Sequence, residues 1–243
     1  MKTLLIHHDD SYAHNLFRLI AEINGEDPVV VLNSAAAGAE LDLRLFDNVV
    51  VSPGPGGLRS GLALRPGPGP GSGSGSGPRL EPRHPGTLRA FGIGTALLAR
   101  SGIPVLGVCL GHQGIAIGEQ ALVTASPRPR HGHLSMIRHD GRELFRGLPQ
   151  NFTAVRHHSL SVQEPLPPNL KATAWAEDGV LMGLRHRTRP LWAVQFQPES
   201  AHTEFAHRML ANFRDLTAAW PRPARTPART PARPRERPSL TVG

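Results

Sequence analysis

The sequence predicts an α/β fold with a mostly parallel central sheet, helices on both faces and a small antiparallel addition. Near the start of the chain, short apolar runs alternate with an amphipathic helical pattern. These runs lack the period-two alternation of a half-exposed strand, which favours parallel strands buried on both faces. The second half instead holds many short strand-like segments separated by turn residues, a pattern typical of antiparallel pairs.

The chain begins with a strand, helix, strand unit. Residues 3–6 and 29–32 are its two apolar runs. Between them, Asp10 or Ser11 can cap a helix whose apolar residues share one face, and Gly25 is placed to end that helix. Such a unit implies a right-handed crossover within a parallel sheet.

Further strands and helices follow in the same order. Residues 49–52 form a strand that leads into Pro53-Gly54-Pro55-Gly56, and a strand at 105–108 ends at Cys109. A helix is expected at 88–99 and another from about His112. The later strand-like segments are 134–138, 153–157, 172–176, 180–184 and 191–195, followed by an amphipathic closing helix at 205–216.

Two segments are expected to lie outside the folded domain. Residues 66–77, PGPGPGSGSGSG, and the Pro/Arg-rich tail 221–243 hold no apolar cluster that could offset the entropy of ordering them. The glycine-rich segment could instead cradle a phosphate, but neither a lysine nor a capped helix follows it directly. We therefore expect one domain over residues 1–220, with a flexible insertion and a disordered tail.

The net charge of +8 raises the possibility of nucleic-acid binding. Residues 221–243 hold six arginines and one glutamate, a net charge of +5, which leaves +3 for the rest of the chain. No basic stripe interleaved with aromatic residues precedes the tail. The sequence therefore predicts no specific nucleic-acid partner.

The cysteine count and the first residues indicate the compartment. One cysteine cannot form an intramolecular disulfide, which fits the reducing cytoplasm. The first residues contain no apolar stretch long enough for a signal peptide or a membrane span. We expect a cytoplasmic protein that does not associate with membranes.

The stretch around Cys109, VLGVCLGHQ, is the most informative part of the sequence. A buried strand that turns sharply into a helix exposes the residue at the turn, and the positive end of the helix favours a thiolate there. The backbone N–H of Leu110 is then available to a developing oxyanion. A buried structural cysteine is the simpler interpretation of an isolated cysteine, but this context favours a nucleophile.

Two further motifs are open to two interpretations. In SPGPG at 52–56, the glycines allow close approach of backbone amides to a substrate and the prolines stiffen the turn, although an ordinary hairpin turn has the same composition. In HHSL at 157–160, the polar residues His157, His158 and Ser159 can belong to a ligand pocket or to an ordinary edge strand.

Six motifs in series give the sequence a family resemblance. They are Asp10-Ser11, SPGPG at 52–56, GVCLGHQG at 107–114, RHGHLSMIRHDG at 130–141, HHSL at 157–160 and FQPES at 196–200. In this order they resemble the class I glutamine amidotransferases over most of residues 1–217. The likeness is greatest to the glutaminase parts of aminodeoxychorismate synthase and anthranilate synthase.

The resemblance implies a class I glutaminase-like three-layer fold and a set of roles. Cys109 would be the nucleophile, Gly54 and Leu110 would supply the oxyanion-hole amides, and Glu199 would orient the catalytic base. The glutamine pocket would be lined by Gly54, Pro55, Gly56, Gln113, Ser159 and Leu160. The implied substrate is L-glutamine, without a metal or a cofactor. The implied partner is a chorismate-using synthase subunit, in aminodeoxychorismate (folate) synthesis rather than anthranilate synthesis.

The sequence departs from the family pattern at residue 197, where the family has histidine and this chain has Gln197. Attack on an amide needs a base that takes a proton and later returns it to the leaving ammonia, and a carboxamide does neither near neutral pH. Glu199 then has no imidazole to orient. The alternative function is therefore a catalytically impaired, glutaminase-like binding or regulatory module. A serine or cysteine hydrolase on a similar fold is disfavoured by SPGPG and HHSL.

Overall fold

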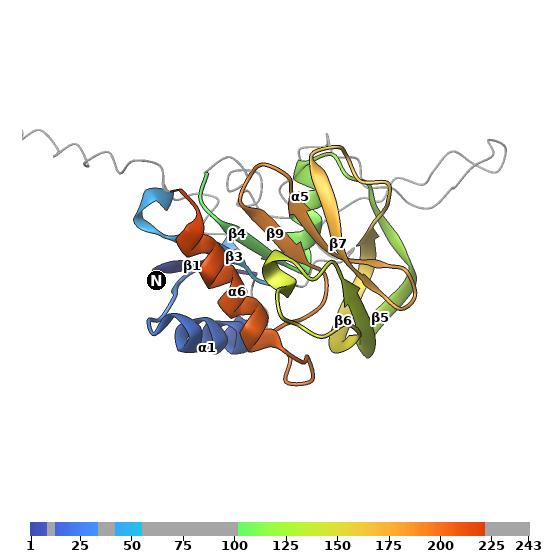
Figure 1. Cartoon of the computed structure of the whole chain (residues 1–243), viewed down its shortest axis with the longest axis horizontal. Coiled ribbons are helices and arrows are strands. Elements are labelled where there is room, and N and C mark those ends of the chain that lie inside the picture. Colours follow the sequence, from blue (N-terminus) through green and yellow to red (C-terminus); the bar gives the residue numbers. More distant parts are fainter. Residues whose placement is uncertain (9–12, 34–41, 55–101, 222–243) are drawn as a thin grey trace, which may run out of the picture.

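The computed structural model describes residues 1–8, 13–33, 42–54 and 102–221. Within these residues, nine strands form one sheet in the order β2-β1-β3-β4-β9-β8-β7-β5-β6, with helices on both of its faces (Figure 1). The predicted α/β class is confirmed. The strands are β1 (Thr3–His7), β2 (Val29–Leu32), β3 (Asn48–Val51), β4 (Val105–Val108), β5 (Val123–His139), β6 (Phe152–Val162), β7 (Leu170–Ala176), β8 (Leu181–His186) and β9 (Leu191–Val194).

The first five strands in the sheet order, β2-β1-β3-β4-β9, are all parallel. Every residue of β3, β4 and β9 is buried, as expected for strands covered on both faces. The pairing places Val51 opposite Gly107, and Gly107 opposite Ala193. The carboxyl ends of β3, β4 and β9 therefore lie together at one edge of the sheet, where open α/β sheets generally bind ligands.

The antiparallel part is larger than the predicted small addition. Strands β8, β7, β5 and β6 each pair antiparallel with their neighbours, and β5 runs for 17 residues. The sequence predicted only its second half, because prolines at 127 and 129 hide the strand pattern of the first half. Proline cannot donate to a strand ladder. The β5–β6 register accordingly shifts between Ala125 and Arg130 and again between His131 and His133.

The described α-helices form the two outer layers. Helices α1 (Ala13–Asn24) and α6 (Ala206–Ala219) cover one face of the sheet, and α5 (Leu110–Gly118) covers the other (Figure 1). Side chains of β1 alternate accordingly, since Leu5 packs into the core beneath α1 and α6 while Leu4 and Ile6 pack into the α5 core. Helix α5 begins two residues earlier than predicted, directly after Cys109. Short 3₁₀ turns occur at η1 (Leu43–Leu45) and η2 (Glu143–Phe145).

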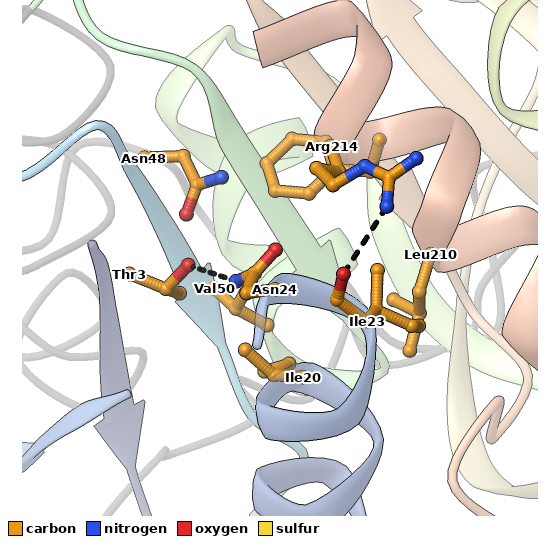
Figure 2. Close-up of a pocket in the computed structure, with 9 residues that line it drawn as sticks. Thr3, Ile20, Ile23, Asn24, Asn48, Val50, Leu210 and Arg214 are labelled. Carbon is orange, nitrogen blue, oxygen red and sulfur yellow. Dashed lines mark hydrogen bonds between the residues drawn. The ribbon is translucent and has the colours of Figure 1, made fainter. Parts of the chain in front are cut away.

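Helices α1 and α6 are tied to the sheet and to each other at one small cavity (Figure 2). Asn24 donates to the hydroxyl of Thr3 at 2.9 Å, and the guanidinium of Arg214 donates to the carbonyl of Ile23 at 3.1 Å. The cavity between them holds about 10 Å³, which is the space of roughly one water molecule. This junction is therefore a packing feature and is too small for a substrate.

Several predictions concern residues outside the described ranges. They are the Asp10 or Ser11 helix cap, the helix at 88–99, Pro55 and Gly56, and the segments 66–77 and 222–243. The domain limits also stay a prediction. Gly25 does follow the end of α1 with a φ of 66°, a conformation that glycine adopts without steric cost. In the part of the chain that is described, no helix is long and apolar enough to cross a membrane.

Candidate active site

Cys109 occupies the turn between β4 and α5, as the sequence predicted. Its backbone has φ 51° and ψ −94°, a region that non-glycine residues rarely adopt and that persists only when surrounding structure enforces it. The enforcing contact is a hydrogen bond of 2.8 Å from the Cys109 N–H to the carbonyl of Val194 at the end of β9. The turn therefore holds the cysteine where β4 and β9 end, with 7% of the residue exposed.

Small residues around the turn let α5 pack directly on the strands. A Cβ added to Gly107 would lie 2.6 Å from the carbonyl carbon of Gly111, and one added to Gly111 would lie 3.1 Å from the Cβ of Val51. Larger residues at these two positions would push the helix away from the sheet. The glycines thus bring the positive N-terminal end of α5 to Cys109, where it favours a thiolate.

Gly54 follows β3 and lies beside the first residue of α5. A Cβ added to Gly54 would lie 2.3 Å from the Cβ of His8 and 3.2 Å from a methyl carbon of Leu110. Ser52 braces the same turn, because its hydroxyl donates to the carbonyl of Pro53 at 2.7 Å and accepts from the N–H of His8 at 3.3 Å. The structure thus brings together Gly54 and Leu110, the two residues predicted to form the oxyanion hole. It requires glycine at position 54 for space.

Described hydrogen bonds join the sulfur of Cys109 to His157 and to Gln195. The Sγ donates to the main-chain carbonyl of His157 in β6 at 3.6 Å. The side-chain amide of Gln195, which follows β9, donates to Sγ at 3.5 Å. The thiol therefore lies between β6 and the end of β9, with an acceptor on one side and a donor on the other.

The HHSL segment reaches the site through its main chain. Besides the carbonyl of His157, the carbonyl of Leu160 lies at the site and accepts a hydrogen bond of 3.2 Å from the side chain of Gln113. Gln113 itself is 3% exposed. Ser159 points to solvent, where its hydroxyl is 3.0 Å from the Nε2 of His131. The two interpretations of HHSL thus both have support, because edge strand β6 presents its backbone to Cys109 and the side chains of His157 and Ser159 to solvent.

Two histidines near the site are buried and neutral. Burial, together with nearby His158, lowers the pKa of His112 to about 3. Burial and the charge of Arg156 lower the pKa of His158 to about 4. The Nε2 of His158 accepts from Arg156 at 3.1 Å and its Nδ1 lies 2.9 Å from the Leu160 carbonyl. Because arginine only donates, Nδ1 of His158 carries the proton, and both ring nitrogens are committed.

Arg156 anchors this part of β6 in the interior. It is fully buried, and it forms a 2.8 Å ion pair with Asp178, whose side chain is 2% exposed. Burial opposes ionisation of Asp178, but hydrogen bonds from Arg156 and from the N–H of Val180, with the charges of Arg156 and Arg130, hold its pKa below the usual value. The ion pair thus fixes the strand whose carbonyls face Cys109.

Gln197 and Glu199 lie on the segment after β9 and are 5% and 3% exposed. The backbone of Gln197 is fixed, because its N–H donates to Val155 at 2.9 Å and its carbonyl accepts from the Thr203 hydroxyl at 2.6 Å. Its side-chain Oε1 is buried without a hydrogen-bond partner among the described residues. Position 197 is therefore rigidly held but carries a group that does not titrate near neutral pH.

A hollow of about 540 Å³ lies between α1 and residues 198–207. Glu199 is among the residues that line it, and Cys109 is not. The hollow therefore lies beside the segment that carries Gln197 rather than around the sulfur.

The fold and this arrangement define the class of protein, and comparison with known families agrees. The chain belongs to the class-I glutamine amidotransferases, whose family model matches residues 4–216. A solved glutamine amidotransferase from Thermotoga maritima superposes with a TM-score of 0.62 at 15% identity, over 90% of this chain and 98% of that one. At that identity the likeness concerns the fold alone.

Relatives narrow the kind of amidotransferase. The chain is 49% identical to aminodeoxychorismate synthase of Streptomyces griseus, over 89% of this chain and 26% of the relative. It thus spans about a quarter of that protein. It is 35% identical to aminodeoxychorismate synthase component 2 of Escherichia coli, over 86% of this chain and 97% of the relative. The identity to anthranilate synthase component 2 of Azospirillum brasilense is also 35%, over 88% of this chain and 95% of the relative.

Gln195 is the site residue that the sequence analysis missed. The sequence predicts Gln195 as the last residue of a buried strand, although packing alone does not favour a polar side chain at that position. In the structure it is fully buried and its amide contacts the sulfur of Cys109. The signal that could have found it is this polarity, two residues before Gln197 on the same segment.

Proposed function

We propose that the chain hydrolyses L-glutamine to glutamate at Cys109 and supplies the ammonia to a chorismate-using synthase. The observation that carries the proposal is the strained turn at Cys109, which places a thiol at the N-terminal end of α5 in a member of the amidotransferase family. Neighbouring groups support it, since Gly54 and Leu110 lie side by side next to the sulfur-bearing turn. The single cysteine suits a cytoplasmic enzyme.

The proposed reaction has two stages. The thiolate of Cys109 attacks the side-chain carbonyl carbon of glutamine, and the carbonyl oxygen becomes an oxyanion that the N–H groups of Gly54 and Leu110 stabilise. Collapse of this intermediate breaks the C–N bond, and the departing nitrogen takes a proton from water to leave as ammonia. Water then attacks the thioester, which releases glutamate and restores Cys109.

Similarity to the relatives supports the proposed partner and product. Identity is higher to the Streptomyces griseus aminodeoxychorismate synthase, at 49%, than to anthranilate synthase component 2, at 35%. This difference favours aminodeoxychorismate as the product and a folate-type synthase as the recipient of ammonia. The relatives give no support to the alternative of a module that only binds glutamine. Gln197 alone motivates that alternative, and we treat its effect as one on the rate of glutamine hydrolysis.

Labelling and turnover together test the proposal. A glutamine-analogue electrophile is expected to modify Cys109, as read by mass spectrometry, and excess glutamine should slow the labelling. Purified protein, alone and with an aminodeoxychorismate synthase partner, is then assayed for glutamate and ammonia, with Cys109→Ser as the inactive control. The proposal fails if labelling is absent or insensitive to glutamine. It also fails if the Cys109→Ser variant releases as much glutamate as wild type.

A further inference from the structure

A chain of buried amides leads from β6 to the sulfur of Cys109. The side-chain nitrogen of Gln113 donates to the carbonyl of Leu160 at 3.2 Å and to the side-chain oxygen of Gln195 at 3.0 Å. The side-chain nitrogen of Gln195 then donates to Sγ at 3.5 Å. Gln113 and Gln195 are 3% and 0% exposed, so neither amide has bulk water as an alternative partner.

The direction of this chain is fixed at the end remote from the sulfur. A carbonyl oxygen can only accept, so Leu160 requires the nitrogen of the Gln113 amide to face it. The same nitrogen meets Gln195, which must therefore present its oxygen to Gln113. The nitrogen of Gln195 is left facing Sγ. An amide that could otherwise turn either end toward the sulfur thus presents only its donor.

The two contacts of the sulfur favour opposite protonation states. The carbonyl of His157, 3.6 Å from Sγ, accepts a hydrogen bond from a thiol, but it turns a lone pair toward a thiolate, which has no proton to donate. The amide of Gln195 donates to a thiolate more strongly than to a thiol, because hydrogen bonds to an ionised acceptor are roughly twice as strong as neutral ones. Gln195 and the N-terminal end of α5 therefore both favour the thiolate, whereas the carbonyl of His157 favours the thiol.

We propose that Gln195 stabilises the thiolate of Cys109 by direct donation and that Gln113 is a positioning residue that fixes the orientation of the Gln195 amide. The inference deepens the proposed function, since it rests on Cys109 as the nucleophile. It assigns a role in activating the sulfur to a part of the site that does not include position 197. In this arrangement Gln113 acts through Gln195.

Alkylation by iodoacetamide tests this without glutamine turnover. In that reaction the thiolate sulfur forms a bond to the CH₂ carbon, the C–I bond breaks and iodide leaves, while the thiol proton has already gone to solvent. The rate against pH therefore reports the fraction of thiolate. We compare wild type with Gln195→Met and Gln113→Met, which keep side-chain length but remove the amide. The control is Gln163→Met, because the side-chain amide of Gln163 donates to the carbonyl and the hydroxyl of Ser161.

For Gln195→Met, the midpoint of the alkylation profile should rise by about one pH unit, with about tenfold slower labelling at neutral pH. Gln113→Met should shift it less, because the Gln195 amide remains but loses its fixed orientation. The double variant should match Gln195→Met alone, since the two residues act in series. Gln163→Met should not move the midpoint. Thermal melts of all variants identify any that unfold.

One further variant keeps the test decisive. If Gln195→Met does not fold, Gln195→Leu removes the amide without adding a charge, and it should shift the midpoint in the same direction. A folded Gln195 variant with a wild-type midpoint overturns the inference, as does a double variant whose shift is the sum of the single ones. Absence of glutaminase activity in wild type, together with the expected shifts, would instead count against the proposed function alone.

Discussion

The proposed nucleophile side of the candidate site, around Cys109, and the proposed base side, at position 197, are built by different means. Around Cys109, position depends on backbone geometry and close packing, with φ 51° at the cysteine and glycines at 107 and 111 that leave no room for a Cβ. At position 197 the backbone is equally fixed by Val155 and Thr203, but the chemistry depends on one side chain. That side chain is a carboxamide, which cannot exchange a proton near neutral pH.

The difference shows which features of such a site a single substitution can remove. Losing the turn at Cys109 would require several coordinated changes, because β4, α5 and β9 all contribute to it. Losing proton transfer requires only one change at residue 197, which leaves the fold and the position of the sulfur intact. The chain can therefore keep a complete nucleophile turn beside an altered base position.

The substitution Gln197→His tests this difference between the two sides most directly. An imidazole at this buried position can take and return a proton, and Glu199 lies two residues further on to orient it. General acid–base catalysis typically contributes about 10²–10⁴-fold, so glutamine hydrolysis is expected to rise by up to that factor. The measurement is kcat for glutamate release, with the melting temperature as the control for folding.

Equal and robust activity in wild type and Gln197→His would contradict this prediction. It would mean that another base already acts, and single substitutions of His157 and His202 would then locate it. His158 is the weaker candidate, because its two ring nitrogens are engaged by Arg156 and the Leu160 carbonyl.

The second prediction concerns the buried histidines that support the nucleophile side. Burial keeps His112 and His158 neutral, with pKa values lowered to about 3 and about 4. Below the usual pKa of histidine the unfolded chain binds protons that the native protein does not, so stability falls as pH falls from about 6.5 toward 4. Each imidazole contributes a slope of at most about 1.4 kcal/mol per pH unit.

Urea unfolding between pH 4.5 and 6.5 measures this slope. His112→Met should lower it by about one imidazole's contribution, roughly 1.4 kcal/mol per pH unit. The matched control, His202→Gln, changes an exposed residue and should leave the slope unchanged. An identical slope in wild type and His112→Met would show that His112 is not held neutral.

The third prediction tests the close packing next to Leu110. Gly54→Ala would bring a Cβ within 2.3 Å of the His8 Cβ, so the turn must shift, at a cost of about 1–3 kcal/mol in unfolding free energy. Glutamine hydrolysis should fall as well. His8→Gly removes the opposing atom and should recover stability in the double variant.

Gly118→Ala is the matched control for this substitution. Among the described residues outside its own helix turn, no atom lies within 4 Å of the added Cβ there. Alanine in the last turn of α5 should therefore be neutral or stabilise by up to about 1 kcal/mol. If Gly54→Ala were as stable as Gly118→Ala, the contact between Gly54 and His8 would be less tight than in the structure.

The parallel half of the fold could be predicted closely, because its strands are short apolar runs bounded by clear turns. Residues 29–32 and 105–108 were predicted with the observed bounds. The antiparallel half could not, since long strands such as β5 run through prolines and arginines, where residues 127–134 include no buried position to mark a strand. Sequence also placed Cys109, Leu110 and Gly54 together. The polarity of Gln195 marks it as unusual at the end of a buried strand, but its contact with the sulfur depends on the meeting of β9, α5 and β6 and could not be predicted.

The prediction with the smallest expected effect tests whether the HHSL segment serves the site through its main chain or through its side chains. Ser159 is exposed and contacts His131, so Ser159→Ala should change the unfolding free energy by no more than about 0.5 kcal/mol. If its hydroxyl lines the glutamine pocket, as the family resemblance implies, the loss of one hydrogen bond should raise KM by about 2–10-fold with kcat unchanged.

Steady-state kinetics on Gln197→His and on the Gln197→His, Ser159→Ala double variant give both constants. His131→Gln is the control, because it removes the partner of Ser159 but leaves the hydroxyl. An unchanged KM in the Ser159 variant would mean that the segment serves the site through the carbonyls of His157 and Leu160 alone.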